Sequence, residues 1–161
     1  MILGILADTH SLNIPSQVIE RFKTVDLIIH AGDIADTSTL KQLKALAPLR
    51  AVQGNQDTAV LKKELPLKDI IVCDNFRIGV THGHMGASSE ALKNAMASFK
   101  DDKIDVVIFG HSHRAFKEHI GPVLYFNPGS PNDLTRAKFF SYGLISIEAG
   151  QVKAEIIRIG K

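Results

Sequence analysis

The amino-acid sequence predicts an α/β fold in a single domain that spans residues 1–161. Short β-branched apolar runs alternate with helical patterns through the first two thirds of the chain, and a hairpin pattern occupies the last third. Hydrophobic residues make up 45% of the chain and charged residues 22%, which is typical of a globular domain with a packed core. No internal repeat or Gly/Ser/Pro-rich linker divides the chain, so we expect one domain.

Five short apolar runs in the first two thirds predict buried strands. They are Ile2–Leu6, Asp26–Ile29, Leu49–Val52, Phe76–Val80 and Val106–Phe109. Continuous apolar runs of this kind are typical of strands in a largely parallel sheet that is covered on both faces. The first run lacks a basic start and meets Asp8 at once, so we expect a strand there rather than a signal peptide.

Three helical patterns lie between these runs. Pro15, Asp36 or Thr37, and Ser88 provide their start signals, and Pro48 stops the second helix. The apolar faces are formed by Val18, Ile19 and Phe22, by Leu40, Leu43 and Leu46, and by Ala91, Leu92, Ala95, Met96 and Phe99. Alternation of strands with helices predicts βαβ units.

The last third of the chain has a different pattern. A strand at Val123–Phe126 runs into Asn127–Ser130, which is a strong turn signal. Leu144–Ile147 and Val152–Ile157 alternate about Ala149-Gly150, which predicts a β-hairpin. No helical pattern appears in this third, so we expect added antiparallel strands that form a second sheet packed on the first.

The composition excludes several classes of protein. Lys plus Arg is 19 and Asp plus Glu is 17, so the formal charge is +2 with both signs interspersed, which argues against a nucleic-acid partner. No apolar run approaches the roughly 18 residues of a membrane helix. The single cysteine, Cys73, cannot form an internal disulfide, so we expect a buried thiol and a cytoplasmic location.

Each of the five apolar runs is followed at once by a small polar cluster, and these clusters hold six of the seven histidines. The clusters are Asp8-Thr9-His10, His30-Ala31-Gly32-Asp33, Gly54-Asn55-Gln56-Asp57, His82-Gly83-His84 and Gly110-His111-Ser112-His113. Ligands of open α/β sheets bind beyond the carboxyl ends of the strands, so we expect the clusters to converge on one edge. The glycines let the backbone leave a strand sharply beside a ligand.

The side chains in these clusters predict a metal centre. The candidate ligands are Asp8, His10, Asp33, Asn55, His82, His111 and His113. Imidazoles and carboxylates without a thiolate suit zinc, iron, nickel, cobalt or manganese. Seven ligands are too many for one ion but suit two ions that share a carboxylate. Two divalent ions, two aspartates and a bridging hydroxide leave a positive charge, which favours an anionic phosphate ester.

In this order, the five clusters resemble the motifs D-x-H, G-D, G-N-x-D/E, a single H and G-H-x-H of the calcineurin-like metallophosphoesterases. The short chain, the Thr81–His84 sequence and the Asn127–Ser130 turn are similar to the small bacterial and archaeal phosphodiesterase branch of that family. The resemblance covers about Met1 to Ser130. Each motif alone is weak, but five in order are highly specific.

The resemblance implies a four-layer β-sandwich of two mixed sheets flanked by helices. It also implies that Asp8, His10 and His113 hold one metal ion, that Asn55, His82 and His111 hold a second, and that Asp33 bridges the two. A metal-bridging hydroxide would attack phosphorus in a small phosphodiester, with Asp33 and Asn55 among the catalytic residues. Manganese is the first choice of ion, with nickel, iron, zinc and cobalt as alternatives.

One position departs from the family pattern. Many family phosphatases have a histidine after the Gly-Asn pair that protonates the leaving group, and this chain has Gln56 there. Glutamine is not a general acid, so the departure favours diesters over monoesters. We take His84 as a substitute proton donor. Of the remaining polar residues, we expect His30 to be buried and hydrogen-bonded, His119 to lie on the surface, and Asp57 to orient a loop.

Three hypotheses follow from these observations. The first is a metal-dependent phosphodiesterase of small phosphodiesters with no membrane partner. Small α/β enzymes often form homodimers, but the sequence leaves the oligomeric state open. The second is a scaffold, since a retromer subunit with this fold lacks a competent metal site, although this chain keeps every ligand. The third is a nuclease, which the shortage of clustered Lys and Arg disfavours.

Overall fold

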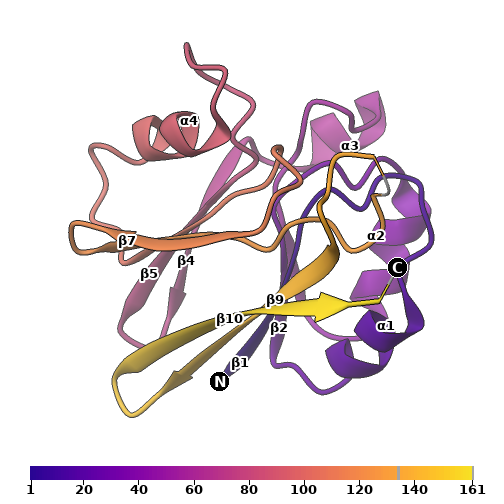
Figure 1. Ribbon diagram of the computed structural model, residues 1–161, viewed down its shortest axis with the longest axis horizontal. Coiled ribbons are helices and arrows are strands. Elements are labelled where there is room, and N and C mark those ends of the chain that lie inside the picture. The colour runs from indigo at the N-terminus through magenta and orange to yellow at the C-terminus, as the bar shows by residue number, and fades with distance from the viewer. Residues whose placement is uncertain (134, 161) are drawn as a thin grey trace.

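The computed structural model describes residues 1–133 and 135–160 and contains two five-stranded sheets. In chain order the elements are β1 (Ile2–Leu6), α1 (Ser16–Phe22), β2 (Leu27–His30), α2 (Thr37–Lys44), β3 (Leu49–Ala51), α3 (Ala59–Glu64), β4 (Lys68–Cys73), β5 (Phe76–Thr81), α4 (Ala91–Ser98), β6 (Val106–Ile108), β7 (Phe116–Ile120), β8 (Val123–Asn127), β9 (Phe140–Glu148) and β10 (Gln151–Ile159). Figure 1 shows α1, α2 and α3 together on one side of the molecule and α4 on the other.

Both sheets are mixed. The first has the order β10-β9-β1-β2-β3, in which β1, β2 and β3 are parallel and the β9–β10 hairpin is antiparallel to β1. The second has the order β4-β5-β6-β8-β7, in which β5, β6 and β8 are parallel and the two edge strands are antiparallel. The predicted class is confirmed.

The core between the sheets is apolar and comes from both of them. Leu3 and Ile5 of β1 pack in one cluster with Ile78 of β5, Ile108 of β6 and Phe126 of β8. A second cluster joins α1 and α2 to the outer face of the first sheet, and a third joins α4 to the outer face of the second. These three interfaces produce the four layers, and burial of their apolar surface is the main stabilising term.

Most of the predicted helices and strands are present, although several begin or end at a different residue than predicted. The hairpin turns at Ala149 and Gly150, which both have positive φ (51° and 73°), as a tight two-residue turn requires. Asp36 caps α2 by accepting a hydrogen bond from Thr39 N, as expected. The predicted cap at Ser88 is wrong: α4 starts after Glu90, whose side chain makes no capping bond, and Ser88 Oγ instead accepts from Glu90 N.

The sequence interpretation missed three elements, α3, β4 and β7. Helix α3 has six residues, too few for a repeated apolar face. Strand β7 is an edge strand in which Lys117, Glu118 and His119 are all exposed, so its apolar pattern is weak. The five predicted strands also do not share one sheet, since β1, β2 and β3 belong to the first and β5 and β6 to the second. Within the described residues, no helix is long and apolar enough to cross a membrane.

Candidate metal centre

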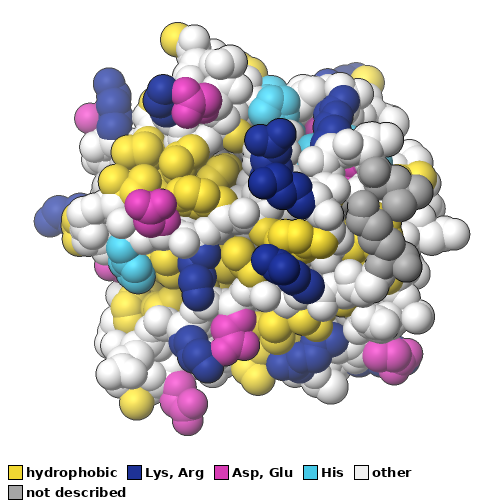
Figure 2. Space-filling model, in the orientation of Figure 1, with side chains coloured by type: hydrophobic (Ala, Val, Ile, Leu, Met, Phe, Trp, Pro, Cys, Tyr) yellow, Lys and Arg dark blue, Asp and Glu magenta, His cyan; other side chains and the backbone are white. Residues whose placement is uncertain are grey.

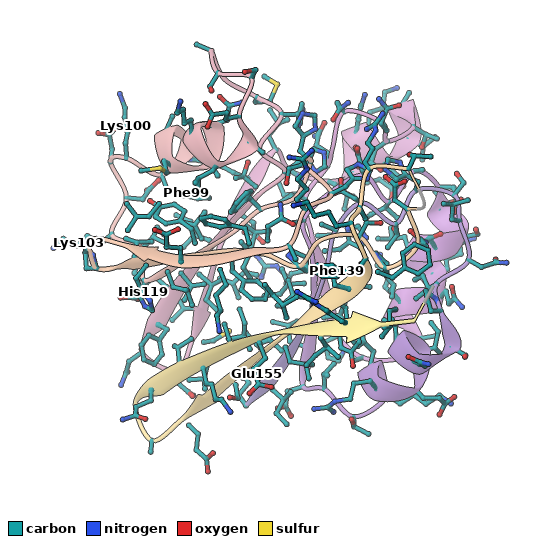
Figure 3. The ribbon with its side chains drawn as sticks, viewed as in Figure 1. Phe99, Lys100, Lys103, His119, Phe139 and Glu155 are labelled. Carbon is teal, nitrogen blue, oxygen red and sulfur yellow. The ribbon has the colours of Figure 1, made fainter. Side chains whose placement is uncertain are left out.

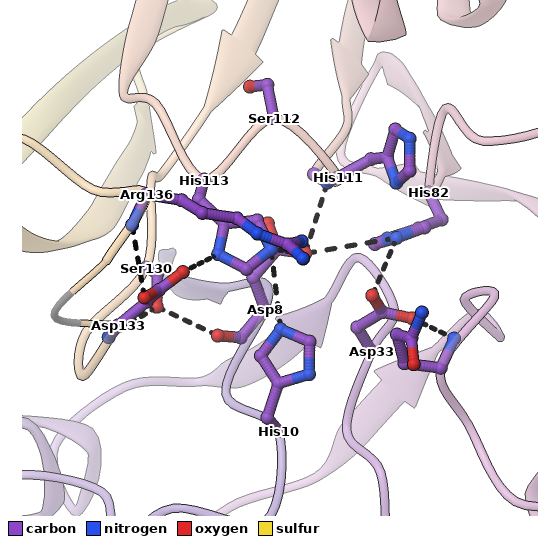
Figure 4. Close-up of polar contacts among 12 residues, drawn as sticks. Asp8, His10, Asp33, His82, His111, Ser112, His113, Ser130, Asp133 and Arg136 are labelled. Carbon is purple, nitrogen blue, oxygen red and sulfur yellow. Dashed lines mark hydrogen bonds and ion pairs between the residues drawn. The ribbon is translucent and has the colours of Figure 1, made fainter.

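The carboxyl ends of five strands meet where the two sheets adjoin, and we call the loops that follow β1, β2, β3, β5 and β6 the metal edge. Two overlapping groups of side chains there present ligand atoms that lie within 4.8 Å of one another. The first group is Asp8, His10, Asp33 and His113, and the second is Asp33, His82 and His111. Asp33 is common to both. The structure therefore brings six of the seven candidate ligands together (Figure 4).

The backbone at the metal edge is unusual. Among the described residues, eight that are not glycine have positive φ, and five of these eight are candidate ligands. They are Asp8 (55°), His10 (50°), Asp33 (56°), His111 (67°) and His113 (56°). This left-handed conformation is strained for most residues, although Asp and His adopt it more readily than β-branched ones. Such strain persists only where surrounding contacts hold it, and it gathers at functional sites.

Two glycines make the close approach of these loops feasible. Gly32 has φ of +91°, and a Cβ there would lie 2.7 Å from His82 Nδ1. A Cβ on Gly54 would overlap the carboxylate and the amide nitrogen of Asp33. The loops after β2 and β3 thus pass directly against ligand side chains, as the sequence predicts.

The first group is built around His113. Its Nε2 lies 3.3 Å from His10 Nε2 and 3.5 Å from Asp8 Oδ1. Its Nδ1 donates a short hydrogen bond to the Asp133 carboxylate, which turns Nε2 toward the site. Two imidazole nitrogens that face each other at this distance suit a shared cation, because their lone pairs repel unless a cation or a proton lies between them.

The second group is built around His82. Its Nδ1 donates to the backbone carbonyl of Ala31 at 2.7 Å, and its Nε2 lies 3.2 Å from Asp33 Oδ2 and 3.8 Å from Asp8 Oδ1. The ring of His111 lies edge-on at 5.1 Å between centroids. Asp33 is fixed in turn because its Oδ1 accepts from Gln56 N at 2.8 Å.

Unpartnered polar atoms test whether these residues fit metal ions. Four buried side-chain atoms of the described residues have no hydrogen-bond partner: Asp8 Oδ2, His30 Nδ1, Asn55 Oδ1 and His82 Nε2. Three of the four belong to candidate ligands, including Asn55. A buried unpaired oxygen or nitrogen is costly, and coordination of a cation would remove that cost. The donor set therefore fits divalent metal ions.

The pKa values of the site residues also indicate a site that suits a cation. Burial raises the pKa of Asp8 to about 7. Burial acts in the same direction on Asp33, but the close approach of His82 and the hydrogen bond from Gln56 N outweigh it and lower its pKa to about 2. Burial opposes protonation of His82, yet Asp33 and Asp8 raise its pKa overall. The two carboxylates thus favour positive charge at His82, and the same field favours a divalent cation between them.

The remaining polar residues that the sequence singled out lie outside the two ligand groups. His84 is half-buried, with its ring 5.2 Å from that of His82 and 6.3 Å from that of His111. His119 is exposed. Asp57 accepts from the amides of Gly54 and Ala35, both at 2.6 Å, and so orients the loops as expected.

His30 is fully buried, as predicted, but it is only half satisfied. Its Nε2 contacts Thr9 Oγ1 at 3.0 Å, while its Nδ1 has no hydrogen-bond partner among the described residues. Burial lowers its pKa to about 3, so the ring is neutral.

Sequence reasoning missed the residues that support the ligands. Asp133 orients His113, Ser130 Oγ donates to the carbonyl of Asp8 at 2.8 Å, and Asn127 Nδ2 donates to the carbonyl of Gly110 at 2.9 Å. The turn at 127–130 therefore shapes the metal edge rather than only reversing the chain. Metal-bound histidines usually donate their second nitrogen to a carboxylate or carbonyl, so a search for a carboxylate partner could have suggested Asp133.

Comparisons with known proteins identify the family of the chain. The family model described as the calcineurin-like phosphoesterase superfamily domain matches residues 1–150. A probable metallophosphoesterase of Methanocaldococcus jannaschii is 36% identical over 99% of this chain and 82% of its own. A protein named as a phosphodiesterase from the same archaeon is 32% identical over 80% of this chain and 83% of its own.

Solved structures share the fold. One described as a novel archaeal phosphodiesterase has a TM-score of 0.77 with 28% identity and covers 98% of this chain and 100% of its own. Vps29 of Entamoeba histolytica in complex with zinc has a TM-score of 0.75 with 25% identity and covers 98% of this chain and 99% of its own.

Proposed function

The chain belongs to the calcineurin-like phosphoesterase superfamily, and we propose that it is a phosphodiesterase that uses two divalent metal ions to hydrolyse small phosphodiesters. The observation that carries the proposal is the pair of ligand groups that share Asp33, together with the buried unpartnered atoms of Asp8, Asn55 and His82. A relative named as a phosphodiesterase supports diesters as the substrate class.

In this proposal each ion has its own ligands. Asp8, His10 and His113 hold the first ion, Asn55, His82 and His111 hold the second, and Asp33 binds both. Manganese is the first choice of ion. Bound divalent ions supply Lewis-acid activation of water and neutralise charge on the phosphate. The chain itself orients the ligands through the Ala31 carbonyl and the Asp133 carboxylate.

His84 serves as the proton donor to the leaving oxygen. It stands beside the second ligand group, and Gln56, in the position where many relatives carry a histidine, is exposed and uses its backbone amide to hold Asp33. His84→Ala should reduce turnover of diesters with poor leaving groups by about 10²–10⁴-fold and leave p-nitrophenyl esters nearly unchanged. Equal effects on both kinds of ester would exclude this role.

The direct test uses purified protein and bis(p-nitrophenyl) phosphate. We expect hydrolysis with added manganese, loss of hydrolysis with a chelator, and two bound ions per chain by elemental analysis. No hydrolysis with manganese, nickel, iron, zinc or cobalt would contradict the proposal.

A scaffold is the second candidate function, because the fold is shared with a Vps29 that binds zinc. A scaffold would bind metal without hydrolysing any diester. The same assay, run with elemental analysis on one sample, separates the two functions.

A further inference from the structure

A cavity of about 780 Å³ opens beside the metal edge. Three segments contribute to its lining: residues 89–92 at the start of α4, residues 109 and 112–116 from the end of β6 to the start of β7, and residues 135, 136, 138 and 139 before β9. His113 lines the cavity and also belongs to the first ligand group, so the cavity adjoins the metal centre directly. Its volume lies within the range of about 300–1,000 Å³ that is usual for small-molecule sites.

Much of the cavity lining is apolar. Leu92 and three phenylalanines line it. The rings of Phe109 and Phe116 are tilted against each other at 6.0 Å, and Arg158 stacks on Phe139 at 3.9 Å. Figure 2 shows hydrophobic side chains gathered over α4 and β7, and Figure 3 shows Phe139 beside β10. Such a wall suits a flat apolar group.

The same lining is also cationic. Arg114, Arg136 and Lys138 line the cavity, and none of the three makes an ion pair with a described residue. Figure 2 shows Lys and Arg side chains next to the hydrophobic area. Glu90, the carboxylate in the lining, is already paired with Lys93. The lining of the cavity therefore has an excess of positive charge, which suits a phosphate.

Arg136 lines the cavity together with His113. Its side chain extends across His113 toward His111 (Figure 4). Its backbone N–H donates to Asp133 Oδ1 at 3.2 Å, so one carboxylate fixes both His113 and the base of this arginine.

We propose that this cavity receives an aromatic ester group of the phosphodiester while Arg136 binds a non-bridging oxygen of its phosphate. The inference rests on the proposed function and specifies its substrate class. A guanidinium binds phosphate oxygens through charge-assisted hydrogen bonds, and the phenylalanine wall removes the aromatic group from water. Diesters with one small and one aromatic group are thus oriented with the aromatic group away from the ions.

The first test varies only the group that enters the cavity. All substrates are p-nitrophenyl diesters with the same leaving group, and the second group is methyl, cyclohexyl or 1-naphthyl. We expect kcat/KM of the manganese-loaded protein to rise on the order of tenfold or more from methyl to naphthyl, through a lower KM. Equal kcat/KM across the series would overturn the cavity assignment.

The second test changes the protein. Arg136→Gln should lower kcat/KM by about 10–100-fold for all three diesters, mainly through KM, and Arg136→Lys should restore part of the loss. Phe139→Ala should lower kcat/KM for the naphthyl diester alone. Lys103→Gln is the matched control, because Lys103 is exposed and lies away from Phe139 (Figure 3). If Arg136→Gln behaves like this control, the role of Arg136 is excluded.

A binding measurement separates this inference from the proposed function. Chelator-treated protein is titrated with 1-naphthyl methyl phosphate, and binding is followed by naphthyl fluorescence. Binding that Arg136→Gln weakens tenfold or more would support the inference even if no diester is hydrolysed, in which case only the proposed function fails. Binding that is equal in wild type and Arg136→Gln would overturn it, whatever the activity.

Discussion

The two ends of the β-sandwich use the same left-handed backbone conformation in different surroundings. At the end opposite the metal edge, which we call the turn end, Asp74, Gly121 and the Ala149-Gly150 pair reverse the chain between hairpin strands. A Cβ on Gly121 or Gly150 would meet nothing within 4 Å. At the metal edge, a Cβ on Gly54 would overlap Asp33.

The left-handed backbone conformation therefore has a local cause at the turn end and a distant cause at the metal edge. A tight turn requires positive φ and needs no support beyond its own two strands. The ligand loops have no such local reason, and contacts from far along the chain hold them, such as Ser130 on Asp8 and Asn127 on Gly110. The metal edge therefore gives up stability in order to aim its side chains, and the turn end does not.

The largest expected effect compares two aspartates with the same conformation. Asp33→Asn at the metal edge and Asp74→Asn at the turn end both keep a residue that tolerates positive φ (56° and 51°). We expect Asp33→Asn to lower phosphodiesterase activity by about 10³-fold, because the charge shared by both ligand groups is lost. Asp74→Asn should leave activity and metal content unchanged. Activity measured beside elemental analysis checks this, and equal activities would remove the distinction between the two ends.

A second pair of variants tests the close packing of the metal edge. Gly54→Ala should lower the free energy of unfolding by about 2–3 kcal/mol and abolish metal binding, because the new methyl group displaces Asp33. Gly150→Ala should cost about 1 kcal/mol, the strain of positive φ alone, and leave activity intact. Urea denaturation measures both. If Gly54→Ala lowers the free energy of unfolding no more than Gly150→Ala does, the metal edge is loosely packed.

A smaller effect concerns the support of one ligand. Asp133→Asn should weaken metal affinity and lower activity by about 10–100-fold, because the amide no longer holds His113 as a carboxylate does. His82 rests on the backbone carbonyl of Ala31, which no side-chain change removes. Metal titration of the variant should therefore show one weakened site and one unchanged site. Equal weakening of both sites would mean that the two groups do not act separately.

The smallest effect concerns the helix caps beyond the ligand loops. Hydrogen bonds from Ser38 and Thr39 lower the pKa of Asp36 below its ordinary value of 3.8. Its stabilisation is therefore complete above that value and is lost as the pH falls through the lower folded-state value. Asp36→Ala should cost about 1 kcal/mol at pH 7 and progressively less as the pH falls below the ordinary value of 3.8.

The control for the helix caps is Glu90→Ala, since Glu90 makes no capping bond to α4. It should change the free energy of unfolding little over the same pH range. Urea denaturation across that range compares the variants, and a cost for Asp36→Ala that does not depend on pH would exclude the ionised cap.

The sequence could predict those features of the fold and of the site that depend only on residues close together along the chain. Apolar runs identified β1, β2, β3, β5 and β6 to within one or two residues at each end, because a buried strand needs a continuous apolar segment. The polar clusters after those runs named the ligands that the structure brings together. The hairpin at Ala149-Gly150 followed from local alternation and turn residues.

Short or exposed elements could not be predicted in the same way. In β7 and α3, few side chains are buried, so hydrophobic periodicity carries little information about them. Asp133 and Ser130 support ligands that lie 20 or more residues away along the chain, and Arg136 lies in an irregular loop. No spacing rule predicts contacts of either kind.

The sequence by itself determined which side chains are candidate metal ligands, and the tertiary structure decided how they are arranged. Ligand type and strand-end position are local properties, so they can be read residue by residue. The division of the five ligand loops between two sheets, the sharing of Asp33 and the cavity beside His113 depend on how distant segments pack. Packing minimises the free energy of the whole chain, and no local pattern contains that information.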